Sequence, residues 1–302
     1  APPRASRRSS EALAFEPRVY GLLSGMRAEL RPSLRVELSQ ARIGDPERSS
    51  PETSSNAVAP TFRIAGLLAP LPALAFSASA ASGKRLPSLF ELFGDRAFVV
   101  ASPELQPERS RTIDAGVNLA RRAGLLRGQA ELRGFVLWID DLIRYERTAQ
   151  LSLRAANAAR ARIEGLELGL DGELGEHLRL SAALNAQRSE NQLGRSLALQ
   201  PGFELYVRPE LAFSLASRER ATLFVEVQQV GLIYLEDSKN STSLPPRAAF
   251  GFGASVELVQ GLLLLQARVR NAFDTLARDV LSRPLPGREI LFSLALRETY
   301  RW

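Results

Sequence analysis

The sequence has 302 residues, of which 45% are hydrophobic and 24% charged, and its formal net charge is +6. It contains no cysteine and a single histidine, His177, which excludes disulfide frameworks, thiolate chemistry and most zinc or Ser-His-Asp sites. Its 39 basic residues are spread along the chain rather than gathered in one dense stripe, so nucleic acid is not an expected partner.

The longest uncharged stretch is Ile64–Gly83, which is long enough to cross a bilayer as a helix. It contains Pro70 and Pro72 and ends in a Ser/Ala-rich segment, so a helix is a poor interpretation. A helical membrane protein is therefore not expected. A membrane β-barrel stays possible, because its strands carry apolar residues in alternation rather than in continuous runs.

Alternation of apolar and polar residues is the main structural signal along the chain. In Leu126–Trp138, apolar or small residues occupy every second position, and Arg127, Glu131 and Arg133 lie between them. The same pattern is found in His177–Gln187, Glu219–Val230 and Leu263–Asn271. We predict about 13 strands, at 15–30, 33–43, 60–69, 72–83, 110–121, 125–147, 152–171, 176–189, 201–216, 219–234, 247–258, 261–272 and 287–302.

The connections distinguish a membrane barrel from a soluble sandwich, which shows the same alternation. Short links are predicted at Arg31–Pro32, Pro70–Leu71, Arg122–Gly124, Gly172–Gly175, Ser217–Arg218 and Val259–Gln260. Long links are predicted at 44–59, 84–109, 148–151, 190–200, 235–246 and 273–286, with 148–151 the weakest case. Outer-membrane barrels have this asymmetry, with short periplasmic turns and long extracellular loops.

The last predicted strand is strongly amphipathic and ends in an aromatic residue. One face holds Ile290, Phe292, Leu294, Leu296, Tyr300 and Trp302, with Glu298 as the exception. An ordinary edge strand that ends in tryptophan would look the same.

Four segments, in this order, resemble the C-terminal half of TonB-dependent receptors. They are GKRLPSLFELFG (Gly83–Gly94), SPELQPERSRTIDAGV (Ser102–Val117), NAARARIEGLELGL (Asn157–Leu170) and RVRNAFDTLARDVLSRPLPGREILFSL (Arg268–Leu294). In the second segment, Ser102 replaces the family's usual Asn and Asp114 its usual Glu. The resemblance covers roughly residues 60–302.

The resemblance implies an all-β, transmembrane, antiparallel up-and-down barrel in the bacterial outer membrane. It also implies TonB-dependent uptake of a siderophore, a cobalamin or a similar large solute. The implied partners are outer-membrane lipid, an N-terminal plug domain and the TonB energy-coupling complex. In this family, the barrel-assembly machinery recognises an amphipathic last strand with a terminal aromatic residue.

A complete receptor of this family has a plug domain and a barrel of about 22 strands, and we find no plug here. We therefore expect residues 15–302 to be the C-terminal part of the barrel domain. Residues 1–14 are expected to be an extracellular loop remnant or disordered. The expected structure is a curled, open sheet with two unpaired edges, and the expected chain is a fragment or one piece of a split gene.

The same segments have a plain structural interpretation. Pro87, Pro103 and Pro107 interrupt strand pairing, which predicts a structured loop at 84–109. The hydrophobic side chains expected to anchor that loop on the barrel rim are Phe90, Leu92 and Phe93. Gly165 and Gly169 predict a bend or close packing, and Pro286-Gly287 predicts the turn into the last strand.

No catalytic, cofactor or metal site is expected. The acidic pairs Asp140-Asp141 and Glu236-Asp237 lack the ligand spacing of a calcium loop and are interpreted as solvated charge. By alternation, five charged residues point into the lumen: Arg127, Glu131, Arg133, Arg220 and Glu226. They either hydrate the wall and brace a plug, or bind an anionic solute, and the substrate-binding residues stay unknown.

Three alternatives to an energy-coupled importer remain open. A passive pore would need an even number of strands, roughly 14, and a closed ladder. A non-functional receptor fragment would carry the same segments without transport. A soluble structural β-protein would share the alternation, although its apolar outward stripes argue against it.

Overall fold

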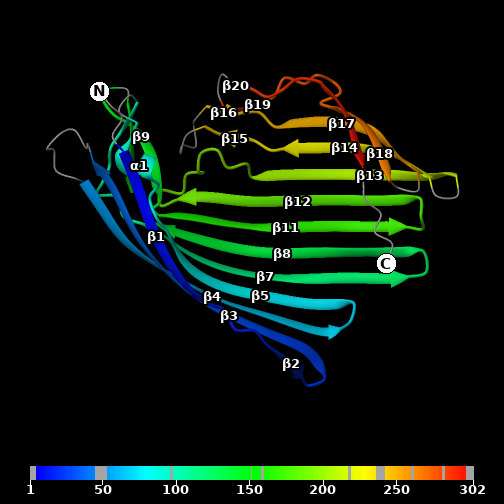
Figure 1. Cartoon of the computed structure of the whole chain (residues 1–302), viewed down its shortest axis with the longest axis horizontal. Coiled ribbons are helices and arrows are strands. Elements are labelled where there is room, and N and C mark those ends of the chain that lie inside the picture. Colours follow the sequence, from blue (N-terminus) through cyan, green and yellow to red (C-terminus); the bar gives the residue numbers. More distant parts are fainter. Residues whose placement is uncertain are drawn as a thin grey trace.

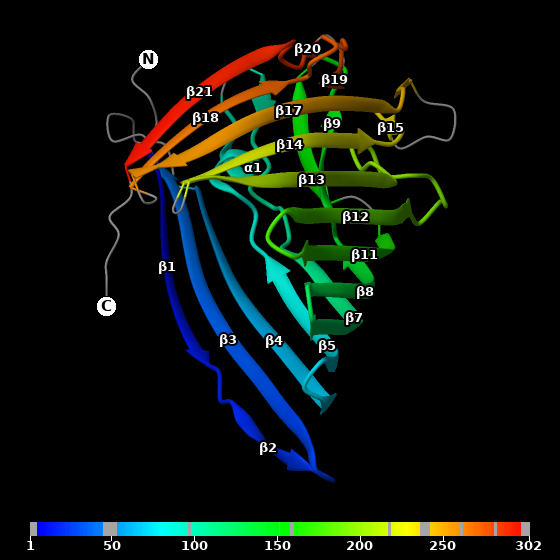
Figure 2. The ribbon, with the colours of Figure 1, turned by 90° about the vertical axis from the view of Figure 1, so that its right-hand side faces the viewer.

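The computed structural model describes residues 5–44, 53–95, 98–150, 152–157, 160–216, 219–235, 242–259, 262–280 and 283–296. Most of these residues form one large antiparallel sheet that curls around a central space (Figures 1 and 2). In sheet order its strands are β1 (Ala5–Phe15) and β2 (Val19–Leu23), β3 (Met26–Gly44), β4 (Thr53–Leu71), β5 (Leu74–Arg85), β7 (Glu108–Ala123), β8 (Leu126–Asp140), β11 (Ala161–Leu174), β12 (Leu178–Asn191), β13 (Phe203–Ala216), β14 (Glu219–Val230), β17 (Arg247–Leu258), β18 (Leu263–Arg270) and β21 (Glu289–Leu296).

The sheet is open at two edges. Its 14 strands occupy one position fewer, because β1 and β2 follow each other along β3. This agrees with the expectation of about 13 strands. Within the described residues no ladder joins β21 to β1 or β2, so the predicted curled sheet with two unpaired edges is confirmed.

Short and long connections alternate, as predicted. Tight turns lie at one end of the strands, and four of the long connections at the other end carry small elements of their own within the described residues (Figure 1). These elements are α1 (Leu89–Phe93), β6 (Val99–Val100), β9 (Ile143–Arg147), β10 (Leu153–Asn157), β15 (Ile233–Tyr234), β16 (Ser243–Leu244), β19 (Arg278–Val280) and β20 (Arg283–Pro284). Among the described residues, no helix is long and apolar enough to cross a membrane.

The first predicted turn, at Arg31–Pro32, is wrong. The chain turns instead at Ser24 and Gly25, whose φ angles of 50° and 82° suit a tight hairpin. Pro32 lies inside β3 and faces Ile64 of β4. On its other side lies the break between β1 and β2. No ladder hydrogen bond is needed there, so the N–H group that proline lacks is not missed.

The predicted strand 125–147 is in fact two strands. Asp141 has a φ of 59°, and there the chain leaves β8 and enters β9. β9 pairs with β10, and β10 also pairs with β6, in a small separate sheet. Of the predicted link 148–151, the weakest of the long ones, the described residues 148–150 lie at the tip of a longer connection between β8 and β11.

The chain termini differ from the expectation or lie outside the description. Residues 5–14 form most of β1 rather than a loop, because β1 pairs along its whole length with β3. The second turn lies at Pro72-Ala73 instead of Pro70–Leu71, and β4 extends into the predicted 44–59 loop. Residues 297–302, with Tyr300 and Trp302, lie outside the described residues.

The pairing between neighbouring strands shows which residues share a face of the sheet. Ile113 pairs with Val136 and Val117 with Leu132, so neighbouring strands present apolar side chains on the same face. This outer face is widely exposed, with Leu132 48% and Phe292 80% accessible. A protein in water would bury such a surface, whereas the outer face of a membrane barrel meets lipid.

Candidate functional site

Buried charged residues gather at two places on the inner side of the sheet. The first, here called the wall cluster, comprises Tyr206, Arg208, Glu210, Glu226 and Arg268 on three strands. The second is the cap, formed by residues 86–95, 98–107, 141–150 and 152–157. The cap lies at the loop end of the strands, and Figure 2 shows α1 and β9 within the curve of the sheet.

Glu226 is the centre of the wall cluster, and its side chain is only 5% exposed. Its carboxylate accepts hydrogen bonds from Arg208 at 3.1 Å, from Arg268 at 2.8 Å and from the Tyr206 hydroxyl at 3.1 Å. Arg208 also lies 2.7 Å from the Glu210 carboxylate. The buried charge is therefore paired and hydrogen-bonded, as a carboxylate removed from water must be.

Two glycines of β17 make room for this cluster. A Cβ added at Gly251 would lie 3.3 Å from the Glu226 Oε2 atom. A Cβ added at Gly253 would lie 2.4 Å from the Phe224 ring. That ring in turn lies under the Arg208 guanidinium, 4.0 Å from its centroid. The glycines let two large β14 side chains lie flat against the wall.

A hollow of about 840 Å³ lies on the inner wall beside the wall cluster. Its polar lining comprises Glu131, Arg133, Glu167, Asn185, Glu204, Tyr206, Gln228 and Gln229. The Asn185 Oδ1 atom is buried and has no hydrogen-bond partner within the described part of the chain. The hollow thus offers both donors and acceptors to water or to a hydrated solute.

The cap begins with a short helix that the local sequence specifies. Ser88 is the N-cap of α1, and its Oγ atom accepts a hydrogen bond from the Glu91 amide at 3.1 Å. The Glu91 carboxylate accepts one from the Ser88 amide at 2.6 Å. This reciprocal capping box satisfies two amides that would otherwise lack partners at the helix start.

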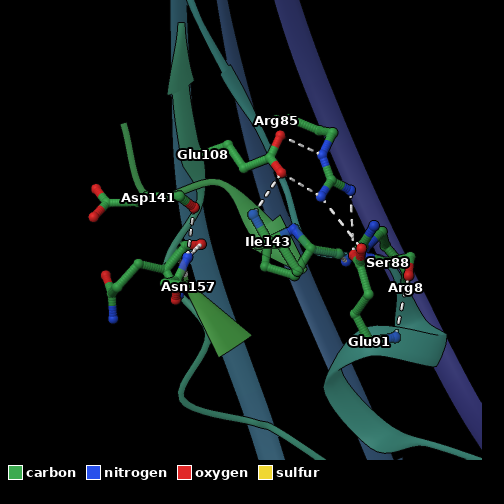
Figure 3. Close-up of polar contacts among 10 residues, drawn as sticks. Arg8, Arg85, Ser88, Glu91, Glu108, Asp141, Ile143 and Asn157 are labelled. Carbon is green, nitrogen blue, oxygen red and sulfur yellow. Dashed lines mark hydrogen bonds and ion pairs between the residues drawn. The ribbon is translucent and has the colours of Figure 1, made fainter. Parts of the chain in front are cut away.

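Arg85, at the end of β5, ties the helix to the barrel (Figure 3). Its guanidinium donates to both Glu108 carboxylate oxygens, at 2.6 and 2.7 Å. It also donates to both Glu91 oxygens at 3.2 Å. Glu108 further accepts a hydrogen bond from the Ile143 amide at 2.7 Å, which joins the second long connection to the first.

Besides the pairing of β6 with β10, Asn157 also links the two connections of the cap. Its side-chain amide donates to the Gln106 carbonyl at 2.9 Å and to the Asp141 carbonyl at 2.8 Å. Its Oδ1 atom accepts from the Gln106 amide at 2.8 Å. One side chain therefore satisfies three backbone groups that no strand ladder reaches.

The cap has a small hydrophobic core of its own. Leu92 is 1% exposed and packs with Phe93, Leu105, Ile143, Ala155 and Ala41 of β3. Just before the helix, the Pro87 carbonyl accepts a hydrogen bond from the Arg8 side chain of β1. Packing and hydrogen bonds together hold the cap against the inner surface of β1, β3 and β5.

The pKa of the Glu91 carboxyl lies below its ordinary value. Burial of the group raises the pKa, but hydrogen bonds from the Arg85 guanidinium and the Ser88 amide outweigh that effect. Glu91 is therefore ionised at neutral pH, and its pairing with Arg85 persists there.

The comparisons with known proteins decide the family. A family model described as "TonB dependent receptor-like, beta-barrel" matches residues 22–272. The chain belongs to this family. No curated protein sequence matches it significantly. TonB-dependent receptors are not enzymes, in agreement with the expectation that this chain catalyses no reaction.

Solved structures agree with the family. The TonB-dependent receptor chain is similar to the copper transporter OprC, with a TM-score of 0.75 and 17% identity over 95% of this chain and 47% of that chain. It is similar to the FrpB iron transporter from Neisseria meningitidis, with a TM-score of 0.69 and 15% identity over 97% of this chain and 46% of that one. The corresponding values for BauA, the ferric preacinetobactin receptor from Acinetobacter baumannii, are 0.66, 15%, 96% and 43%.

These identities establish a shared fold, and this chain spans about half the length of each of the three structures. The fold class inferred from the sequence, an antiparallel up-and-down transmembrane β-barrel sheet, is confirmed.

The five residues predicted to face the lumen have the expected parity in their strands. Arg133 pairs with Glu131 at 2.7 Å and lies 3.8 Å from Asp114 of β7, and Glu226 is the centre of the wall cluster. Arg127 and Arg220 line a second hollow, of about 710 Å³, at the tight-turn end.

The sequence did not single out Tyr206, Arg208 and Arg268 as partners of Glu226. The signal that could have placed them on the inner face is their alternation with apolar residues along the strands.

Of the three side chains predicted to anchor the loop at 84–109, two are buried and one is not. Leu92 and Phe93 anchor the cap, as expected, but Phe90 is 47% exposed and lies 6.4 Å from the Tyr145 ring. The reason is helical spacing, since Leu92 and Phe93 share the face of Leu89 and Phe90 does not.

The glycines and the histidine have local structural surroundings. A Cβ at Gly165 would lie 2.7 Å from the Ala186 carbonyl, which confirms close packing, whereas Gly169 has nothing within 4 Å. The Asp274 carboxylate accepts a hydrogen bond from the Arg288 amide at 2.8 Å, directly after the predicted Pro286-Gly287 turn. The His177 Nδ1 atom lies 3.1 Å from the Ala212 carbonyl.

The acidic pairs show no metal-binding arrangement within the described residues. Asp140 and Asp141 form ion pairs with arginines on the outer face. Glu236-Asp237 lies outside the described residues.

Proposed function

We propose that this chain forms part of the barrel of an outer-membrane receptor that imports a scarce solute. The match to the TonB-dependent receptor barrel over residues 22–272 carries the proposal. The proposed cargo is a siderophore, a cobalamin or a similar large solute. Support comes from similar structures that are named as transporters of copper or iron, or as the receptor for ferric preacinetobactin.

Placement in the bacterial outer membrane is supported by the outer face of the sheet. The outward residues from Leu166 to Leu174 of β11 are all leucine or glycine, and those from Leu178 to Ala186 of β12 are all leucine or alanine. Each run covers about 9 residues, which is the length that a tilted strand needs to cross a bilayer. Lipid on this face would cover the exposed leucines.

Energy coupling would come from a plug domain in the lumen, on which the TonB complex acts. The inner face of β5 supports this partner, because Ser77, Ser79 and Ala81 are small and leave room beside the wall. The inner face of β13 is bulkier, with Tyr206 and Arg208. We propose that the hollow beside the wall cluster and the wall cluster itself face the plug and the passing solute.

The test is uptake by living cells. The complete protein that contains this chain is expressed in bacteria that lack their own receptors for ferric siderophores and cobalamin, and accumulation of each radiolabelled solute is measured. One solute is expected to accumulate in cells that have the energy-coupling protein and not in cells without it. Equal accumulation in both strains would identify a passive pore instead.

Two further measurements isolate the contribution of this chain. Membrane fractionation should recover the protein with the outer membrane, and recovery in buffer without detergent would support a soluble protein. Cells that express residues 1–302 alone are expected to import nothing, since the proposed plug lies outside these residues. Robust uptake by those cells would contradict the energy-coupled mechanism.

A further inference from the structure

The outer face of the sheet changes abruptly at the loop-side end of the apolar band. In β7 the outward residues within 113–119 are uncharged, and Arg111 and Arg121 lie at the two ends of this run. The same level continues across the neighbouring strands, because Trp138 of β8 pairs with Arg111 and with Arg162 of β11. A tryptophan between apolar and charged residues is typical of a membrane–water interface.

Arginines gather at this boundary, and two acidic residues hold them in place. Asp140 Oδ2 accepts a hydrogen bond from Arg111 at 2.9 Å, and its Oδ1 atom lies 3.1 Å from the Arg160 Nε atom. Asp141 accepts from Arg109 at 2.7 and 3.1 Å. A single carboxylate thus holds two guanidiniums side by side.

The guanidiniums remain accessible in spite of these contacts. The side chains of Arg109, Arg111 and Arg160 are 63%, 68% and 81% exposed. A guanidinium has five N–H donors, and the contacts to Asp140 and Asp141 use one or two of them. Several donors of each arginine are therefore directed at solvent.

These residues surround a hollow of about 710 Å³ on the outer wall. Its lining includes four arginines and three acidic residues, together with Trp138, Asn191 and Gln192. Lys84 lies directly opposite Arg109 in the ladder and adds a fifth positive charge. The lining and Lys84 together carry five positive and three negative charges, so the site is rich in hydrogen-bond donors, and forked guanidinium donors match phosphate oxygens.

We propose that this hollow binds the phosphate of an anionic lipid headgroup in the outer leaflet. The next outward residue of β11 is Glu164, whose carboxylate pairs with Arg162 at 2.6 Å. The position of the hollow selects a lipid over a soluble anion, because exposed Ile113 lies next to Arg111 on the membrane side and exposed Leu166 lies beyond Glu164. The acyl chains of a lipid would cover these residues while its phosphate contacts Arg111 and Arg160. The inference rests on the proposed membrane location.

The test uses the complete receptor, purified in detergent, and native mass spectrometry. The probes are lipid A with two phosphates, the same lipid without phosphates, and inorganic phosphate. The double variant Arg111→Gln/Arg160→Gln is expected to lower lipid A occupancy roughly 10-fold. The control Arg121→Gln, on the same face of β7 at the opposite boundary, should leave occupancy unchanged.

A second variant separates binding from folding. Asp140→Asn breaks the same ion pairs as the double variant but removes a negative charge, so lipid A occupancy should stay equal or rise. A fall in both variants would overturn the proposal, as would equal binding of the dephosphorylated lipid. Displacement of lipid A by inorganic phosphate at equal concentration would point to a soluble anion instead. Because binding is measured in detergent, failed fractionation to the outer membrane would count only against the proposed function.

Discussion

Two networks of arginine and glutamate lie on the inner side of this barrel sheet, and they connect very different things. In the cap, Arg85 joins Glu91 and Glu108, which belong to a loop helix and to the strand that follows it. In the wall cluster, Glu226 joins Arg208 and Arg268 of strands that lie on either side of it in the same sheet. The chemistry is the same, but only the first network holds elements that backbone pairing leaves unattached.

The comparison shows that the role of an ion pair depends on what else connects its partners. Strands β13, β14, β17 and β18 form a continuous backbone ladder, so the wall cluster mainly sets the charge of the lumen. The cap touches the barrel mainly through side chains, so its position depends on Arg85 and on the packing of Leu92. Substitutions should therefore separate cap opening from barrel unfolding.

Removal of the cap core is the strongest way to test this separation. Leu92→Ala should destabilise the cap by about 2–5 kcal/mol, because it leaves a cavity at a fully buried position. Hydrogen exchange of the amides in α1 and β9 should accelerate, while exchange in β11 and β12 stays slow. Phe90→Ala, at a neighbouring exposed position, should change little, and equal effects of both variants would contradict the assignment of the core.

Loss of the cap ion pairs should have the next largest effect. Arg85→Ala removes charged hydrogen bonds to two carboxylates and should lower the free energy of cap opening by about 2 kcal/mol, since the arginine is half exposed. Limited proteolysis should then cut between 86 and 107 more quickly. Lys84→Ala serves as the control, because Lys84 lies next to Arg85 on the opposite face; faster cleavage in this control would show that the strand end, not the ion pair, holds the cap.

The wall cluster should respond in the opposite manner. Glu226→Gln leaves two guanidiniums without their shared carboxylate, and we expect a loss of about 1–2 kcal/mol in barrel stability. Thermal unfolding of the barrel should reveal it, with Glu204→Gln on the same wall as the control. Hydrogen exchange in the cap should not change, and accelerated cap exchange would show that the two networks are coupled.

Acidification should produce the smallest effect on the cap. The pKa of Glu91 is lowered in the folded protein, so its contribution to stability is present above the ordinary value of 4.5. That contribution is lost as the pH falls through the lowered pKa, when Glu91 takes up a proton and releases Arg85. Cap exchange should accelerate below about pH 4, and Glu91→Gln should reduce this pH dependence.

The sequence predicted the parity of the strands well, because parity depends only on local alternation. It placed Arg133 and Glu226 on the inner face and Leu132 and Val225 on the outer face without knowledge of any partner strand. Register was harder, because it depends on where each turn lies. Neither Ser24-Gly25 nor the break at Asp141 stands out beside Pro32 and the long alternating run 125–147.

The cap was only partly predictable for a related reason. The sequence Ser88-Leu89-Phe90-Glu91 contains the capping-box spacing, so the start of α1 could have been found. The partners of that helix could not, because Glu108 and Ile143 reach Arg85 only after two separate connections fold together. Such contacts depend on tertiary structure and leave no periodic trace in the sequence.

The unequal length of the strands gives the barrel an oblique opening. β3 and β4 have 19 residues each, whereas β17 has 12 and β18 has 8. Since about 9–11 residues suffice to cross the bilayer, the wall rises well above the headgroups on one side and hardly at all on the other. Ala41 and Ile43, against which the cap packs, belong to the raised part. On the β17–β18 side the rim carries the separate short hairpins β15–β16 and β19–β20 instead, so one side of the opening is built from continuous strands and the other from loop elements.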